Sequence, residues 1–215
     1  MLQTLIMLHG RPRAGKDTVA AFMEREYGFK VMAFATHLYR EVAEAFDVTV
    51  EQLASDDWKT RGQTLLTPWA CSNKVFAELL ASYLRPGQLA TSRDVLQLWG
   101  TEYRRAADNM YWVRQLAADF VDEIHKGTKH IVISDAREVP EATWGLGRAL
   151  AGVVANVEVW EIIRPDLTTE REGGNPNHSS NKRYPSSLID CTITNDGAFP
   201  DVLLSRVRPF LQHLK

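Results

Sequence analysis

The sequence has few cysteines and no excess of positive charge, the features that mark disulfide-rich, metal-binding and nucleic-acid-binding proteins. It holds two cysteines, Cys71 and Cys191, which lie far apart and give neither a disulfide framework nor the spacing of a metal site. Its 25 basic and 27 acidic residues leave a net charge of −2, so no general attraction to DNA or to anionic membranes is expected. The N-terminus carries neither a basic leader nor a long apolar run. We therefore expect a cytoplasmic protein without stable nucleic-acid or membrane partners.

The bulk composition is that of an ordinary globular protein. Hydrophobic residues make up 45% and charged residues 24% of the 215 positions. A chain of this length can bury a substantial core. We expect one domain over residues 1–215, with an insertion at about 47–90 and a lid at about 164–187.

The most informative stretch is residues 10–18, Gly-Arg-Pro-Arg-Ala-Gly-Lys-Asp-Thr. It follows the apolar run 5–8, which is typical of a buried strand, and it precedes residues 19–23, which are typical of the first turns of a helix. A glycine-rich loop in this position surrounds an anion with backbone N–H groups and a helix N-terminus. The spacing therefore predicts a phosphate-binding loop.

Within this loop each residue type has a separate predicted task. Gly10 and Gly15 allow a close backbone approach, and Lys16 supplies a charge for the outer phosphates. Asp17 stands where Ser or Thr usually binds Mg²⁺, so it is predicted to hold Mg²⁺ directly or through water, with Thr18 reaching a phosphate. Alternatively, Asp17 only complements the helix dipole. The predicted ATP-binding residues are Gly10, Arg13, Ala14, Gly15, Lys16, Asp17 and Thr18.

Strand and helix patterns alternate in the second half of the chain. Residues 129–134, 157–163 and 191–194 are predicted strands, and residues 139–150 and 202–214 are predicted helices. This alternation predicts an α/β protein with a parallel sheet and helices on both faces. Because such sheets bind ligands at the carboxyl ends of their strands, residues that follow these strands are expected to converge with the glycine loop. They are Gly10, Asp135 and Arg164.

Polar residues that follow two of these strands carry candidate chemistry. Asp135 is placed to take Mg²⁺ through water, and Arg137 to face phosphates; the alternative is a structural ion pair. Arg164 opens a Gly-, Pro- and Asn-rich segment predicted to be a mobile basic lid. The predicted catalytic residues are Lys16, Asp17, Arg137 and Arg164, and the predicted metal ligands are Asp17 and Asp135. The lid residues Arg171, Lys182 and Arg183 could equally be solvated charges.

A helical stretch is predicted from residue 92 to 125, with a break near 108–109. Its polar residues Arg93, Gln97 and Arg104 could reach a nucleotide. Trp112 could stack on a base, although core burial is the usual place for Trp.

These motifs, taken in order, resemble those of the phage-type deoxynucleoside monophosphate kinases. The motifs are residues 10–18, Leu-Gln-Leu-Trp-Gly-Thr-Glu (96–102), Asp-Asn-Met-Tyr-Trp-Val (108–113), Ser-Asp-Ala-Arg (134–137), Ile-Ile-Arg-Pro (162–165), His-Ser-Ser (178–180) and Ile-Thr-Asn-Asp-Gly (193–197). The resemblance covers nearly the whole chain apart from the insertion. One departure is Asn181, where the family often has an acid shortly after the lid histidine.

The resemblance implies a P-loop kinase three-layer sandwich with a mostly helical insertion on the substrate side. It also implies that the protein transfers the γ-phosphoryl group of ATP to a deoxynucleoside 5'-monophosphate, with the help of Mg²⁺. Such an enzyme would supply precursors of viral DNA in the host cytoplasm, and it is often a homodimer. The implied substrate-binding residues are Lys59, Arg61, Arg93, Gln97, Arg104, Trp112 and Arg137.

Two other functions are compatible with the same loop. A kinase of a hydroxyl acceptor, such as a hydroxymethylated base in DNA or a dephospho-CoA-like substrate, would use Asp17 or Asp135 as a base. A nucleotide-binding switch without catalysis is the third hypothesis, but residues 194–197 lack the lysine of a guanine-specific Asn-Lys-x-Asp motif.

Overall fold

The structure, a computed structural model of the chain, describes residues 2–165, 183–197 and 200–214. The chain divides into two compact units. The first comprises Met1–Phe34 and Leu116–Lys215, and the second comprises Ala35–Gln115. Each unit is described by itself below.

The first unit is built on a five-stranded parallel sheet. Its strands are β1 (Leu2–His9), β2 (Lys30–Met32), β3 (His130–Ile133), β4 (Val154–Ile163) and β5 (Cys191–Thr194), in the order β2-β3-β1-β4-β5. Every strand pair is parallel, so all carboxyl ends lie at one edge of the sheet. The central strand β1 is buried along most of its length, because neighbours hydrogen-bond on both sides and helices cover both faces.

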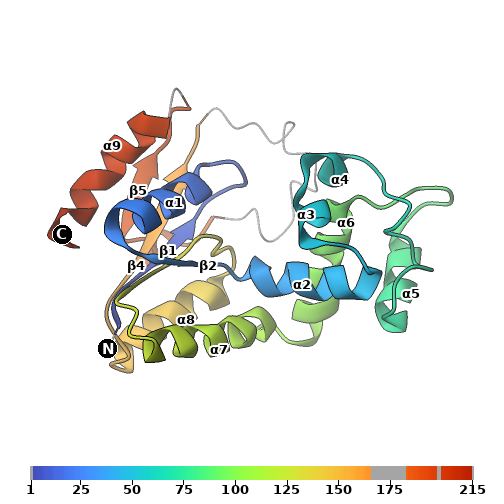
Figure 1. The fold of residues 1–215 in the computed structure, drawn as a ribbon, viewed down its shortest axis with the longest axis horizontal. Helices are drawn as coiled ribbons and strands as arrows, with labels where there is room; N and C mark the ends of the chain where they lie inside the picture. The colour runs from blue at the N-terminus through green and yellow to red at the C-terminus, as the bar shows by residue number, and fades with distance from the viewer. Residues whose placement is uncertain (1, 166–182, 198–199, 215) are drawn as a thin grey trace. The chain divides into compact units, whose positions relative to one another are not determined.

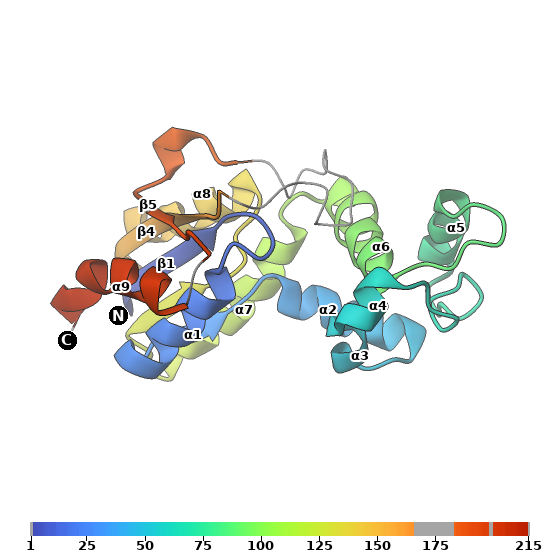
Figure 2. The same ribbon diagram turned by 90° about the horizontal axis from the view of Figure 1, so that it is seen from above.

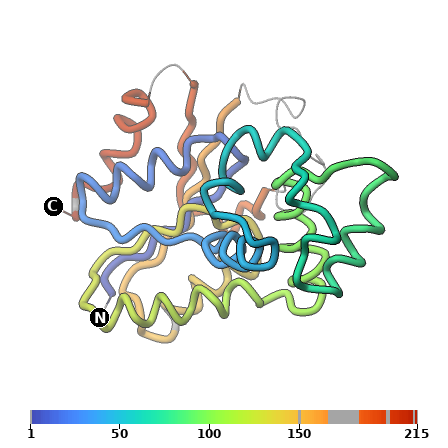
Figure 3. The backbone as a smooth tube through the Cα atoms, turned by 45° about the vertical axis from the view of Figure 1, so that its right-hand side comes forward, coloured from blue at the N-terminus to red at the C-terminus, as the bar shows by residue number. Residues whose placement is uncertain are grey.

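Helices cover both faces of this sheet (Figure 1). They are α1 (Lys16–Tyr27), α7 (Tyr111–His125), α8 (Val139–Leu150) and α9 (Pro200–Leu211), with short 3₁₀ turns at Ser186–Leu188 and Gln212–Leu214. Helix α9 lies beside α1 on one face, and their apolar residues share a core with Ile6, Leu8 and Trp160 of the sheet (Figure 3). Helix α8 packs on the opposite face, against β4 and β1. The predicted α/β fold, a parallel sheet with helices on both faces, is confirmed.

The second unit is helical in the part of the chain described. Its elements are α2 (Ala35–Phe46), α3 (Val50–Ala54), α4 (Asp56–Thr60), α5 (Lys74–Tyr83), α6 (Ser92–Gln97) and a π-helix (Leu98–Arg105). Helices α3, α4 and α6 pack together (Figure 2). Helix α5 packs on the π-helix, where Phe76 contacts Trp99 with ring centroids 4.5 Å apart.

The unit begins at Ala35, twelve residues before the predicted insertion at 47–90. The domain organisation stays a prediction. None of the helices that the structure describes is long and apolar enough to cross a membrane.

Candidate phosphate-binding site

The glycine loop lies between β1 and α1, as its sequence predicts. Strand β1 ends at His9 and helix α1 begins at Lys16, with Gly15 at φ 107° before it. The N-cap residue of α1 is Gly15, which has no side chain to hydrogen-bond to the first N–H groups of the helix. The positive end of the helix dipole at this N-terminus attracts an anion.

Lys16 is buried within the loop that precedes it. Its side chain is 6% exposed, and its ammonium group donates hydrogen bonds of 2.8 Å to the carbonyl oxygens of Gly10 and of Arg11. The ammonium group is thus held across the loop. A phosphate placed on the loop would meet both the N–H groups and this cation, which fits the donor group of a kinase.

Two neighbouring strands fix the position of the loop. A Cβ atom on Gly10 would lie 2.3 Å from the carbonyl oxygen of Ile162 in β4, so only glycine fits there. Asn195, which follows β5, donates from Nδ2 to the carbonyl oxygen of Ala14 at 2.8 Å. A Cβ atom on Gly15 would come within 2.8 Å of that same Nδ2. The close packing therefore depends on both glycines.

The sheet brings the predicted strand-end residues to the edge that carries the loop. Strands β3 and β4 flank β1, so Asp135 and Arg164 follow strands adjacent to the one that precedes Gly10. Asp135 is half-buried, and its Oδ1 accepts a 2.8 Å hydrogen bond from the N–H of Phe34. This bond joins the end of β2 to the end of β3. The expected convergence at one edge is confirmed, whereas the roles of the side chains stay predictions.

Glu141 organises the loop that carries Arg137. Its side chain is 2% exposed, and Oε2 accepts hydrogen bonds from the N–H groups of Arg137 at 2.6 Å and of Glu138 at 3.0 Å. The carboxylate therefore fixes the backbone of Arg137 and Glu138, the two residues that directly precede α8.

A second set of contacts ties residues 183–184 to the same edge of the sheet, and we call it the 183–184 anchor. Arg183 donates from Nε and Nη2 to the two carboxylate oxygens of Glu161, at 2.7 and 2.6 Å. Tyr184 stacks on His9 with centroids 3.8 Å apart, and its hydroxyl donates to the carbonyl oxygen of Glu138 at 2.9 Å. The anchor thus involves β1, β4 and the segment after β3.

The hydrogen bonds of His9 define its protonation. Nδ1–H donates to the carbonyl oxygen of Ala136 at 3.0 Å, and Nε2 accepts from the N–H of Tyr184 at 3.3 Å. Only the neutral imidazole satisfies both bonds. Burial lowers the pKa of His9 below its usual 6.5 and outweighs the bond to Ala136 and the charge of Glu161, which act in the opposite direction.

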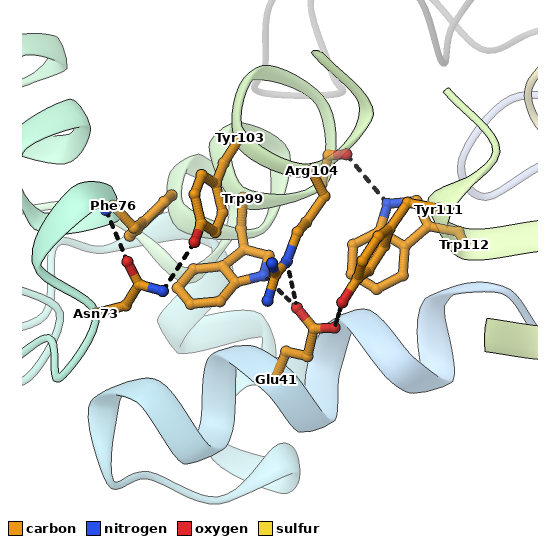
Figure 4. A network of polar contacts seen from close by, with 9 residues as sticks. Glu41, Asn73, Phe76, Trp99, Tyr103, Arg104, Tyr111 and Trp112 are labelled. Carbon is orange, nitrogen blue, oxygen red and sulfur yellow. Dashed lines mark hydrogen bonds and ion pairs between the residues drawn. The ribbon is translucent and has the colours of Figure 1, made fainter. Parts of the chain in front are cut away.

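In the second unit one carboxylate accepts hydrogen bonds from three side chains, two in the π-helix and one in α7 (Figure 4). Glu41 of α2 accepts from Trp99 Nε1 and from Arg104 Nε at 2.8 Å each, and from the hydroxyl of Tyr111. The guanidinium of Arg104 also lies 4.8 Å from the ring centroids of Tyr103 and Tyr111. Burial and the bond to Glu41 raise the pKa of Tyr111 to about 12, so its hydroxyl stays a donor at neutral pH.

The other predicted substrate-binding residues lie in different surroundings. Lys59 is half-buried at the end of α4, and the exposed Arg61 pairs with Asp57 at 3.1 Å. Arg93 and Gln97 are half-buried on α6. Trp112 is 3% exposed and its Nε1 donates to the carbonyl oxygen of Gly100 at 3.1 Å.

The ring and the N–H of Trp112 are therefore used within the core of the unit. A contact between Trp112 and a base stays a prediction. The lid residues Arg171, His178, Asn181 and Lys182 lie outside the described residues.

The carboxylates suit a metal ion that is bound mainly by phosphates. Within residues 2–165, 183–197 and 200–214 no group of three or more His, Cys, Asp or Glu side chains could form a metal site of its own. Asp17 is exposed at the start of α1, and Asp135 follows the adjacent strand β3. One or two carboxylates beside a phosphate chain are what protein-bound Mg²⁺ commonly uses, so the residues present fit it.

Comparison with known proteins gives a partial similarity to a phage kinase. No protein-family model matches the chain. Over 123 residues, 57% of this chain, it is 28% identical to the deoxynucleotide monophosphate kinase of Enterobacteria phage T4. The match spans 46% of that relative, so this chain aligns with less than half of its length.

Two solved kinase structures align with nearly the whole chain. One is a sugar kinase from Janibacter sp., at 15% identity over 99% of this chain and 95% of that chain, with a TM-score of 0.43. The other is the dephospho-CoA kinase from Campylobacter jejuni, at 12% identity over 100% and 99%, also with a TM-score of 0.43. At these scores neither structure bears on what this chain binds. The resemblance to phage-type deoxynucleoside monophosphate kinases is confirmed by the similarity to the phage T4 enzyme.

Proposed function

We propose that this protein is a kinase that transfers the γ-phosphoryl group of ATP to a deoxynucleoside 5'-monophosphate. One observation carries the proposal. The loop before α1 holds the ammonium group of Lys16 beside the N-terminus of that helix, at the edge of the sheet where β3 and β4, the strands before Asp135 and Arg164, also end. The partial similarity to the phage T4 enzyme supports a deoxynucleoside monophosphate as the acceptor.

The residues of the loop would hold the donor. The N–H groups at the start of α1 and the ammonium group of Lys16 bind the phosphate chain, and the hydroxyl of Thr18 lies in the first turn of the same helix. Asp17 and Asp135 would hold Mg²⁺, which neutralises charge on the transferred group.

Arginines would provide the remaining positive charge. Arg137 and Arg164 neutralise the transferring group and the acceptor phosphate. The acceptor is already an anion, so its attack needs no strong general base; position and charge account for most of the catalysis. Contacts with the acceptor are proposed for Lys59, Arg61, Arg93, Gln97 and Arg104, of which Arg104 is held by Glu41.

The test is a steady-state assay of ATP consumption with each free deoxynucleoside monophosphate. We expect ADP release that requires the acceptor, and a kcat lower by about 10³ or more in Lys16→Ala and in Arg164→Ala with the fold intact. Circular dichroism checks the fold. Turnover with a hydroxymethylated oligonucleotide or with dephospho-CoA, and none with monophosphates, would show a hydroxyl acceptor instead. Binding of ATP without turnover of any acceptor would favour a nucleotide-binding switch.

A further inference from the structure

The peptide groups on both sides of the Arg137 Cα atom are held by buried side chains. In the group before it, the carbonyl oxygen of Ala136 accepts from Nδ1–H of His9 at 3.0 Å. The N–H of Arg137 in the same group donates to Oε2 of Glu141 at 2.6 Å. In the group after it, the N–H of Glu138 donates to that same oxygen at 3.0 Å. Because a peptide group is planar, bonds that fix both planes also fix the φ and ψ angles of Arg137.

The 183–184 anchor holds the next carbonyl group along the chain. The hydroxyl of Tyr184 donates to the carbonyl oxygen of Glu138 at 2.9 Å, and the ring of Tyr184 stacks on His9. Both rings are buried. Residues from β1, from the anchor and from the first turn of α8 therefore contact three consecutive residues, 136–138.

Capping of α8 accounts for only part of what Glu141 does. The helix begins at Val139, so Glu138 is its N-cap residue and Glu141 is its third residue. A glutamate at this position commonly accepts a hydrogen bond from the N–H of the N-cap residue. Glu141 also accepts from the N–H of Arg137, and that bond is the shorter of the two. The second bond is not part of a helix cap and acts on the backbone of Arg137.

The side chain of Arg137 differs from the arginines that hold the sheet unit together. Arg183 and Arg206 each pair with a carboxylate at 2.6 Å. The guanidinium group of Arg137 is half-buried and has no hydrogen bond or ion pair within the described part of the chain. A fixed backbone below a cation that no protein group uses is suited to a ligand, because less freedom is lost when the ligand binds.

We propose that Glu141 is a positioning residue for phosphoryl transfer, whose carboxylate holds the backbone of Arg137 so that the guanidinium group is in place before the reaction. The inference rests on the proposed function, in which Arg137 neutralises the transferring group. Charge that develops in a transition state is stabilised best by groups that need not reorganise. A displacement of about 1 Å can lower a rate by about 10²-fold. Turnover therefore depends on where the acceptor oxygen of Glu141 lies, and not on its charge.

Two variants separate the position of this acceptor from its charge. Glu141→Gln keeps an oxygen at the same distance from the backbone and removes the charge. Glu141→Asp keeps the charge and withdraws the oxygen by one carbon–carbon bond. Each change is made in the natural protein and in Arg137→Ala. Steady-state assays with ATP and a deoxynucleoside monophosphate measure kcat, and circular dichroism with thermal unfolding checks the fold.

Gln52→Ala is the matched control for the loss of a helix cap. Gln52 is the third residue of α3 and accepts from the N–H of the N-cap residue Thr49 at 2.8 Å. It belongs to the other unit and has no proposed role in the reaction. This variant should lower the Tm and leave kcat unchanged.

We expect Glu141→Asp to lower kcat by about 10-fold or more, and Glu141→Gln to lower it by less than about 3-fold. Binding of a non-hydrolysable ATP analogue, measured by calorimetric titration, should change by less than about 2-fold in both variants, because the glycine loop holds the donor. In Arg137→Ala neither change should lower kcat further, since the group through which Glu141 acts is then missing.

Three results would overturn the inference. The first is a kcat of Glu141→Asp equal to that of the natural protein. The second is a larger loss in Glu141→Gln than in Glu141→Asp, which would make the charge decisive. The third is an equal loss with and without the Arg137 side chain, which would show an effect on the fold alone. Failure of the proposed function would look different, because the natural protein would then turn over no monophosphate and this inference would fail with it.

Discussion

At the scale of single residues, His9 makes stability depend on pH. Burial lowers its pKa in the folded state below 6.5, so on acidification the unfolded chain takes up the proton first. The stability that neutral His9 contributes above pH 6.5 is then lost as the pH falls through the pKa of the folded state. Protonation would also place a second N–H against the N–H of Tyr184.

We predict that, below pH 6.5, the free energy of unfolding falls more steeply with decreasing pH in the natural protein than in His9→Asn, by up to about 1.4 kcal/mol per pH unit. Asparagine can still donate to the carbonyl oxygen of Ala136 but does not titrate. Urea unfolding between pH 7.5 and 5 measures the difference. If the free energy of unfolding changed with pH equally in the two proteins, His9 would be protonated to the same degree in the folded and unfolded states.

The residues of the site differ in how far the sequence revealed them. Gly10 and Lys16 were predictable because their spacing between a strand and a helix is demanding. Glu161 and Glu41 were not, since an acid in a strand or in an amphipathic helix usually faces solvent. Their partners Arg183 and Arg104 are 22 and 63 residues away in sequence, so tertiary contact alone identifies the pairs.

At the scale of elements, the seam between the glycine loop and β4 is a site of high sensitivity. A Cβ on Gly10 would meet the backbone of Ile162, which is held in the sheet and cannot move aside. Gly10→Ala should therefore lower the free energy of unfolding by about 3 kcal/mol and weaken ATP binding. In Gly28→Ala the new Cβ would meet no neighbouring atom, but the φ of 68° still disfavours alanine. The free energy of unfolding should therefore fall by about 1 kcal/mol from backbone strain alone. Urea unfolding compares them, and equal losses would rule out the clash as the cause.

The Glu41 contacts join α2, the π-helix and α7. Glu41→Ala leaves the buried indole N–H of Trp99 without its acceptor and also releases Arg104, so a loss of about 2–4 kcal/mol is expected. Glu41→Gln keeps the shape and should lose less. Glu44→Ala, an exposed acid in the same helix, should stay within about 0.5 kcal/mol. Urea unfolding followed by near-ultraviolet circular dichroism measures all three, and a Glu41→Ala effect no larger than the Glu44 control would contradict this role.

Element prediction succeeded where burial gives a regular pattern. The helix predicted at 139–150 has those bounds, and the break near 108–109 separates the π-helix from α7. Strand β2 was missed because Lys30-Val31-Met32 is too short to show a period. The π-helix was missed because its apolar residues follow the spacing of an ordinary helix, and the backbone alone reveals the change.

At the scale of the whole molecule, the folded chain divides into two compact units, while the predicted domain organisation stays a prediction. Apolar patterns identify elements, but they do not say which elements share a core. Helix α2 was not assigned to the insertion because it follows Phe34 without a proline or glycine boundary. Since the glycine loop belongs to the sheet unit, binding of the donor should stabilise that unit directly.

Ligand-linked stability tests this view in one experiment. A non-hydrolysable ATP analogue at 100 times its Kd should add about 2.7 kcal/mol, which for a chain of this length raises the Tm by about 5–10 °C. Lys16→Ala should abolish the shift, because the ammonium group held against Gly10 and Arg11 is the buried cation of the loop. Adding each nucleoside monophosphate to the complex should raise the Tm further only for the acceptors that bind. An unchanged Tm with the analogue at millimolar concentration would contradict donor binding, and a shift that persisted in Lys16→Ala would place the nucleotide elsewhere.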